Sequence, residues 1–410
     1  MLHRRALLAL MGASGLSACM GGAVSRASGP DPKMRPQPNA GFDAWLDGFR
    51  HRARAAGIGE GTLNTGLRGA GWIPGVVERD RNQTEFTRTT EDYLAIAVSD
   101  ERLATGRAAV SQYGRVLQAV EARYGVDRHI VAAVWGLESF FGTRRGDVPV
   151  VSALATLAYD GRRGAFFESQ LIAALKILQA GDVTADRMVG SWAGAMGHTQ
   201  FIPTSYLAFA VDFTGDGRRD IWSDDPSDAL ASTAAYLAKN GWASGGRWGL
   251  EVAVPAGFDT GLAGRGKGRA VSDWRALGLR AADGGAIPDH GAASLILPAG
   301  PTGPGFLIFR NFNAILRYNN AENYALGIGH LADRLAGGGP IIGRFPPDAT
   351  GLTLEDRKEI QRRLTARGYD TQGSDGVIGA KSRSAISAFQ AANGMAVTGE
   401  PSVELLRALR

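Results

Sequence analysis

The chain has 410 residues, with a hydrophobic fraction of 44% and a charged fraction of 21%, which exclude wholesale disorder and allow two or three folded domains. The net charge is only +5 and no basic run is interleaved with aromatic residues, so no nucleic-acid partner is expected. The single cysteine excludes an intramolecular disulfide and a cysteine-based zinc site.

The first residues have the pattern of an export signal. Arg4 and Arg5 precede a short apolar stretch, and the segment ends in Leu16–Cys19, which resembles the lipobox of bacterial lipoproteins. The resemblance implies a signal peptide over residues 1–18 and acylation of Cys19, which would anchor the protein to a membrane. By the same resemblance, Met20 in place of aspartate favours the inner face of the outer membrane, facing the periplasm. An ordinary secretory signal with an accidental cysteine is the alternative.

Glycine, proline and serine dominate residues 19–40, which predicts a flexible tether. Helical spacing of apolar residues then predicts a helix that starts after an N-cap at Asp127, a second that stops at Gly181, and a third that ends near Gly241. Short apolar runs among glycine, aspartate and proline predict a small β-rich insertion over residues 245–305.

Helical spacing returns over residues 321–335, and the Gly/Pro-rich segment 336–350 is interpreted as a linker. It separates a large unit, residues 41–335, from a short module at residues 351–410. The fold class predicted for the whole chain is therefore mainly α.

Glu138 is the residue that periodicity singles out for chemistry. Ile130, Val134 and Glu138 are spaced four apart, so the carboxyl shares the apolar stripe of its predicted helix. Its sequence neighbours are aromatic: Trp135, Phe140 and Phe141. Desolvation there would raise the pKa of the carboxyl toward the range of a general acid. The alternative is a solvated glutamate, or one paired with Arg144 or Arg145.

Three longer segments and three short ones carry a resemblance to a known family. They are Ala133–Gly142, Leu154–Arg163 and Ser191–Pro203, with Asp80–Gln83, Arg310–Phe312 and Arg317–Asn319. In this order they resemble the lytic murein transglycosylase B family across residues 41–335. The resemblance implies a lysozyme-like, α-rich catalytic core.

The family cleaves the β-1,4 bond between N-acetylmuramic acid and N-acetylglucosamine in peptidoglycan, and leaves a 1,6-anhydromuramoyl end. Because the C6 hydroxyl of the substrate is the nucleophile, one glutamate suffices, first as acid and then as base, and its position here is Glu138. Asp147 or Asp160 as a second carboxylate would instead make a hydrolytic muramidase, whereas Glu168 is expected to be solvated. A non-catalytic wall-binding scaffold is the other alternative.

Residues of the glycan cleft follow from the same motifs. The resemblance implies that Ser191 and Gln200 bind the sugar near the scissile bond, and that Arg162 and Arg163 meet the acidic lactyl-peptide side. It assigns an aromatic and amide wall to four more residues: Tyr93, Tyr236, Tyr318 and Asn319. A solvated loop pair is the alternative for the two arginines, and helix packing is the alternative for Tyr93 and Tyr236. His198 stands where glutamine or tyrosine is expected, which would make binding pH-sensitive.

The segment 212–220 resembles the first half of a calcium loop. The expected ligands are Asp212, Thr214, Asp216, Arg218 and Asp228, the last by resemblance to relatives that bind calcium here. Extra residues between Trp222 and Asp228 break the strict spacing, and a metal-free cluster of Asx turns is the alternative. No cofactor is expected to be required for the reaction.

The module at residues 351–410 resembles the small three-helix peptidoglycan-binding domain. Its motifs are Glu359–Leu364, Arg367–Tyr369, Asp375–Gly379, Ala385–Gln390 and Val397–Gly399. A generic helical interaction module is the alternative. The expected partners are peptidoglycan strands and, through Cys19, a membrane; the sequence identifies no partner among cell-wall synthesis or division proteins.

Overall fold

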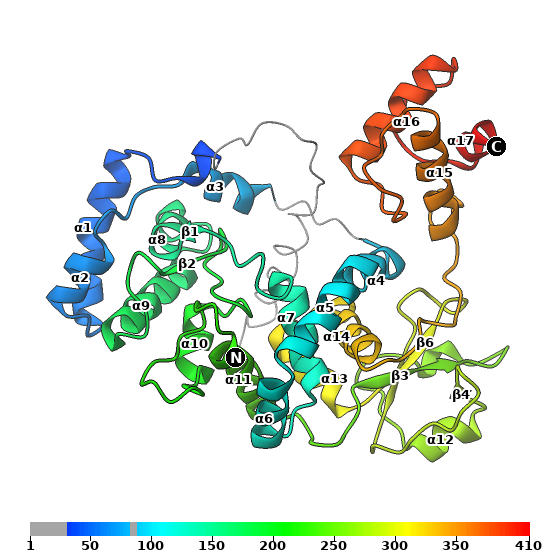
Figure 1. Ribbon diagram of the computed structural model, residues 1–410, viewed down its shortest axis with the longest axis horizontal. Coiled ribbons are helices and arrows are strands. Elements are labelled where there is room, and N and C mark those ends of the chain that lie inside the picture. Colours follow the sequence, from blue (N-terminus) through cyan, green and yellow to red (C-terminus); the bar gives the residue numbers. More distant parts are fainter. Residues whose placement is uncertain (1–30, 83–87) are drawn as a thin grey trace. The chain divides into compact units, whose positions relative to one another are not determined.

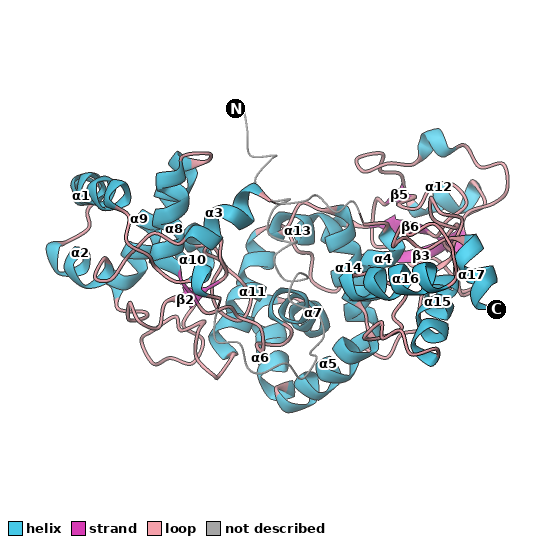
Figure 2. Cartoon of the chain, turned by 90° about the horizontal axis from the view of Figure 1, so that it is seen from above, coloured by secondary structure: helices cyan, strands magenta, loops and turns pink. Residues whose placement is uncertain are grey.

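The structure, a computed structural model, describes residues 31–82 and 88–410, so the predicted signal peptide and Cys19 lie outside the described residues. Helices account for 51% and strands for 6%, which confirms the mainly α class (Figures 1 and 2). In the two described ranges, no helix has both the length and the apolar character that crossing a bilayer requires.

The chain forms two compact units. The first, called the Glu138 unit, holds the described residues 31–82 and 105–240. Its helices are η1 (Pro32–Met34), α1 (Ala40–Ala55), α2 (Glu60–Gly66), α3 (Pro74–Arg81), α6 (Gly114–Tyr124), α7 (Arg128–Ser139), α8 (Val150–Asp160), α9 (Gly164–Ala180), α10 (Pro203–Phe209) and α11 (Ser227–Lys239). Helix α8 packs on α9, and α11 packs on both α6 and α7. Helix α5 (Asp100–Gln112) crosses the division between the units.

The predicted helix ends in this unit are confirmed. Asp127 caps α7 by accepting a hydrogen bond from the backbone N–H of His129, and Gly181 ends α9 in the left-handed conformation. A two-stranded antiparallel pair, β1 (Val148–Pro149) with β2 (Val189–Gly190), has no sequence signal because each strand has only two residues.

Part of the predicted N-terminal tether is ordered. The backbone N–H of Gln37 donates to the carbonyl of Trp72 over 2.7 Å, and Met34 is buried. Residues 31–39 therefore do not behave as the flexible segment that their composition predicts.

The second unit, called the C-terminal unit, holds the described residues 88–104 and 241–410. Its elements before the module are α4 (Thr90–Ala97), β3 (Gly249–Ala253), η2 (Thr260–Leu262), α12 (Val271–Ala276), β4 (Arg280–Ala281), β5 (Ser294–Ile296), β6 (Gly305–Ile308), α13 (Arg310–Tyr318) and α14 (Glu322–Leu335). The strands form one antiparallel sheet in the order β4-β3-β6-β5, as the β-rich prediction requires. Leu250, Leu307 and Leu295 lie side by side across it and pack with the buried Trp274 of α12.

The last three helices are α15 (Leu354–Ala366), α16 (Ala380–Ala392) and α17 (Val403–Leu409) (Figure 1). They share a small hydrophobic core of their own. Thr353 and Asp356 form a capping box at the start of α15. The preceding segment 336–350 is held in place, because the Glu251 carboxylate accepts the backbone N–H groups of Ile342 and Gly343.

Candidate active site

Glu138 lies in the last turn of α7, a helix that is enclosed by protein. Every residue from 131 to 141 is buried except Glu138, which is partly exposed. Helices α6 and α11 pack against α7, so the apolar surface extends well beyond the single stripe that the sequence predicts. Glu138 is thus the one partly exposed residue of a stretch that is otherwise buried.

The backbone around this carboxyl is strained. Phe140, Phe141 and Gln200 have φ angles of 51°, 56° and 55°, in the left-handed region that non-glycine residues rarely adopt. Each costs about 1–2 kcal/mol, and such strain gathers at functional sites. Gly136 makes the turn possible, because a Cβ there would lie 2.5 Å from the Phe141 ring.

The loop over residues 189–201 joins the end of α7 and carries two of the predicted substrate residues. The Ser139 hydroxyl donates to the carbonyl of His198. Gln200 Nε2 donates to the carbonyls of Arg145 (3.0 Å) and Gly197 (2.8 Å), which fixes the orientation of its amide. In the same loop the Ser191 hydroxyl accepts the backbone N–H of Ala195.

Tyr236 is placed by α11, the helix that packs on α7. Its half-buried ring lies against Phe209, with ring centroids 4.6 Å apart, and against Phe201, 5.9 Å away. Tyr236 thus makes the helix-packing contacts that were the alternative to glycan binding, and it does so on a helix that packs against the helix of Glu138.

Arg162 and Arg163 both turn to Asp80, which is 1% exposed. Arg162 Nε lies 2.6 Å from Asp80 Oδ2, and Arg163 pairs with Oδ1. Burial opposes ionisation of Asp80, but the two guanidinium groups outweigh it and hold the pKa of this carboxyl below its usual value. The pair therefore ties α3 to the turn between α8 and α9.

Three predicted residues of the glycan wall belong to the C-terminal unit: Tyr93 on α4, Tyr318 at the end of α13, and Asn319. Asn319 is 1% exposed and its Oδ1 accepts the backbone N–H of Ala321. Its Nδ2 has no hydrogen-bond partner within the described residues.

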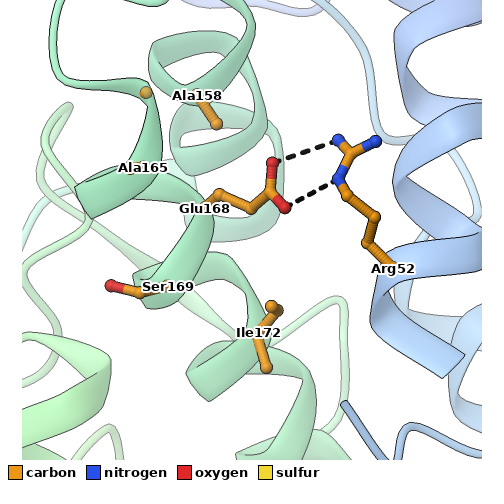
Figure 3. A pocket seen from close by; sticks show the side chains of 7 residues that line it. Arg52, Ala158, Ala165, Glu168, Ser169 and Ile172 are labelled. Carbon is orange, nitrogen blue, oxygen red and sulfur yellow. Dashed lines mark hydrogen bonds and ion pairs between the residues drawn. The ribbon is translucent and has the colours of Figure 1, made fainter. Parts of the chain in front are cut away.

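The other acids that the sequence raised are held by arginines. Glu168 pairs with Arg52 through two hydrogen bonds of 2.7 and 3.0 Å, beside a surface pocket (Figure 3). Asp160 pairs with Arg81. Asp147 is largely exposed, 3.6 Å from Arg35. Glu168 is therefore ion-paired rather than simply solvated.

The candidate calcium loop brings three of its five predicted ligands together. Carboxylate oxygens of Asp212, Asp216 and Asp228 lie within 4.8 Å of one another. Asp228 also accepts three backbone N–H groups, yet burial raises its pKa. Thr214 donates to Asp212, and the backbone N–H of Arg218 donates to Asp216.

Two family comparisons cover almost all of the chain after residue 40. Residues 41–333 match the family described as "Transglycosylase SLT domain", and residues 353–409 match a peptidoglycan binding domain. The first match spans well over half of the chain. The chain therefore belongs to the transglycosylase SLT family.

Individual relatives agree with this family. The chain is 34% identical to "Membrane-bound lytic murein transglycosylase B" of Escherichia coli (strain K12) over 248 residues, which is 58% of this chain and 65% of that protein. It is 49% identical to SltB3 of Pseudomonas aeruginosa, solved in complex with NAG-NAM-pentapeptide, with a TM-score of 0.73 over 91% of this chain and 100% of that one. A complex of E. coli Slt35 with calcium is 28% identical, with a TM-score of 0.61, over 73% of this chain and 93% of that one.

The sequence did not predict the contacts by which Trp135, Arg145 and His198 support the site. Trp135 Nε1 donates to His198 Nδ1 over 3.1 Å. The Arg145 guanidinium donates to the carbonyls of Trp222 and Ser223 and lies 3.3 Å from Asp224. The only available signal was the unexpected residue type at position 198.

Proposed function

We propose that the protein is a lytic transglycosylase that cleaves the β-1,4 bond between N-acetylmuramic acid and N-acetylglucosamine in peptidoglycan. Glu138 protonates the leaving oxygen and then takes the proton of the muramoyl C6 hydroxyl, which attacks C1 of its own ring. The product ends in a 1,6-anhydromuramoyl residue. The observation that carries the proposal is Glu138 itself, the one partly exposed position in the buried stretch 131–141.

A single carboxyl can serve both steps because the nucleophile is part of the substrate. A hydroxyl on the same ring acts at a high effective concentration, so no second protein group needs to hold a water. A hydrolytic muramidase would need that second carboxylate at the bond. Of the two candidates for that role, Asp160 is paired with Arg81, which supports the one-carboxylate reaction, and Asp147 is largely exposed, 3.6 Å from Arg35.

The substrate class is supported by relatives. SltB3 of P. aeruginosa was solved with NAG-NAM-pentapeptide and also with NAG-anhNAM-pentapeptide. We assign sugar contacts near the scissile bond to Ser191 and Gln200, and a place in the aromatic and amide wall to Tyr236. Asn319 is assigned to the wall because its buried Nδ2 donor has no partner among the described residues, and a ligand oxygen would supply one.

The two arginines differ in how well they suit the peptide side of the substrate. The Arg162 side chain is 48% exposed and can meet an acidic group while it holds Asp80. Arg163 is 21% exposed and its guanidinium lies 4.9 Å from the Phe167 ring, which favours a structural role. Tyr93 and Tyr318, which belong to the C-terminal unit, are proposed as glycan contacts on the resemblance alone.

The experiment is digestion of purified sacculi with wild type, Glu138→Gln and Glu168→Gln. The Glu138 variant should lose at least ~10²–10⁴-fold in rate while it stays folded, because its amide cannot exchange a proton. Glu168→Gln is the matched control and should cleave normally. Mass spectrometry should find anhydro ends. Reducing ends, which carry one added water, would establish the muramidase, and no release by wild type would leave a wall-binding scaffold.

The location follows from Cys19 and from the E. coli relative, whose name calls it membrane-bound. We place the protein in the periplasm, anchored by acylated Cys19 to the inner face of the outer membrane. Cys19→Ala should move the protein out of the membrane fraction. A variant that stays there after high-salt washing would exclude this anchor.

Calcium is proposed as a structural ion at Asp212, Asp216 and Asp228, in keeping with the calcium complex of Slt35. The donor set fits, since hard carboxylate oxygens are the ligands that this cation prefers. The ion would neutralise charge that burial disfavours at Asp228. The three C-terminal helices are proposed to bind peptidoglycan strands, which raises the local concentration of substrate.

A further inference from the structure

His198 is a buried side chain that joins the end of α7 to the loop 221–225. It is 4% exposed, and its ring centroid lies 5.7 Å from that of Trp135. A Cβ on Gly142 would lie 2.4 Å from His198 Nδ1, so the glycine is needed for the ring to sit there. Nothing in the proposed reaction uses this imidazole.

The partners of the ring define its protonation state. The Trp135 indole N–H can only donate, and it lies 3.1 Å from Nδ1, so Nδ1 accepts and carries no proton. The carbonyl of Ser223 can only accept, and it lies 2.7 Å from Nε2, so Nε2 carries the proton. Arg145 Nη1 also lies 3.2 Å from Nε2, but it donates to the carbonyls of Trp222 and Ser223. The contacts of Trp135 and Ser223 therefore favour the neutral imidazole with its proton on Nε2.

The same residue holds α7 on both sides of Glu138. Trp135 precedes Glu138 by three positions and is held by the His198 ring. Ser139 follows Glu138 directly, and its hydroxyl donates to the His198 carbonyl while accepting the N–H of Gly142. The last helical turn is thus fixed at two points, with the carboxyl between them.

We propose that His198 is a positioning residue, whose neutral imidazole clamps the turn that aims Glu138. The inference rests on the proposed function, because it needs Glu138 to be the acting group. A clamp of this kind acts on the chemical step and leaves ground-state binding of the glycan unchanged, since His198 is buried. A misplacement of about 1 Å can cost on the order of 10² in rate.

Protonation of His198 would remove its hydrogen bond with Trp135. A second proton, on Nδ1, would face the Trp135 N–H donor and break that hydrogen bond. Burial lowers the pKa of His198. The hydrogen bond to the Ser223 carbonyl raises this pKa, the Arg145 guanidinium 3.2 Å from Nε2 lowers it, and Asp224 and Asp225 raise it, but the net shift is downward. The ring is therefore neutral at neutral pH, and the clamp opens only as the solution becomes acidic.

The test compares wild type with His198→Ala and His198→Gln on soluble glycan chains. The alanine variant should lose roughly 10- to 100-fold in kcat with KM nearly unchanged. Glutamine can present one acceptor and one donor in place of the two ring nitrogens, so it should restore most of kcat. It does not titrate, so its kcat should persist to lower pH than that of the wild type.

A spectroscopic readout on wild type is independent of activity and of the folding of any variant. Long-range ¹H–¹⁵N spectra should show His198 with a bare Nδ1, and the Trp135 indole signal should shift when the ring is protonated. A proton on Nδ1 at neutral pH would overturn the proposal. A folded His198→Ala variant with the kcat of the wild type would also overturn it. The same would follow if kcat decreased at the same acidic pH in the wild type and in His198→Gln. An active Glu138→Gln would instead refute the proposed function and leave the spectra unchanged.

Discussion

Replacing Arg357 with methionine should destabilise the C-terminal unit strongly, although Arg357 lies far from the proposed site in the sequence. Its side chain is 4% exposed, and Nε donates to the carbonyl of Gly376 over 2.9 Å. The two terminal nitrogens pair with Asp92 and Asp348, and Glu91 lies 3.5 Å away. One buried cation thus fastens α15 to α4 and to the segment 336–350.

The magnitude follows from what the variant leaves behind. Methionine keeps the length of the apolar stem but removes the charge and every donor, so three carboxylates lose their shared cation. Breaking a buried ion pair by removing one partner costs about 3–5 kcal/mol. Burial raises the pKa of Glu91, against the pull of Arg357, so this carboxyl would protonate more readily in the variant. The deficit should therefore be smaller at pH 5 than at pH 7.

Thermal unfolding by calorimetry measures the effect. At about 2–4 °C per kcal/mol, the transition of the C-terminal unit should fall by roughly 6–20 °C at pH 7. Arg362→Met is the matched control, since Arg362 is exposed on the same helix. If both variants unfold at the same temperature, the ion pairs of Arg357 do not stabilise the C-terminal unit and the reasoning is refuted.

Three further outcomes are expected. Added Ca²⁺ should raise the Tm of the wild type, and an unchanged Tm would exclude the site. Asp216 is an exposed ligand, so Asp216→Asn should only abolish this rise. Asp228→Asn should abolish the rise and also lower the Tm without metal, because Asp228 accepts backbone hydrogen bonds. Burial lowers the pKa of His330 to about 4, so the unfolded chain takes up this proton first as the pH falls. The free energy of unfolding should therefore decrease by about 3 kcal/mol between pH 7 and pH 4, and His330→Gln should flatten that part of the profile measured in urea. Deletion of residues 351–410, combined with Asp92→Asn to limit the charge left unpaired, should weaken sedimentation with sacculi. Cleavage of short soluble glycan chains should be unchanged. If the folded deletion variant no longer cleaves these chains, the module is part of the cleft.

Local signals predicted the parts of the fold that depend on neighbours in sequence. The N-cap at Asp127 and the stop at Gly181 follow from side-chain and backbone chemistry within a few residues, and both are confirmed. The motif around Glu138 carried the family, which the match over residues 41–333 confirms.

Contacts between distant segments could not be predicted from those signals. Arg357 and Asp92 are 265 residues apart in the sequence, and no sequence pattern around either residue predicts their ion pair. The resemblance assigns Arg162 to the substrate, but the buried Asp80 needs a cation beside it, and Arg162 supplies one. Composition gave 336–350 as a linker, but only the fold supplies the Glu251 carboxylate that holds it.

His198 and the segment that precedes Asp228 are connected by hydrogen bonds. Ser223 lies between Trp222 and Asp228, and its carbonyl accepts a hydrogen bond from His198 Nε2. The Asp220 carboxylate accepts a hydrogen bond from the backbone N–H of Ser223, and the Asp228 carboxylate accepts one from the backbone N–H of Asp220. A histidine at position 198 needs such an acceptor, because a buried N–H without a partner costs about 1–3 kcal/mol. The hydrogen bonds from Asp228 through Asp220 and Ser223 to His198 therefore join the candidate calcium loop to the turn that carries Glu138.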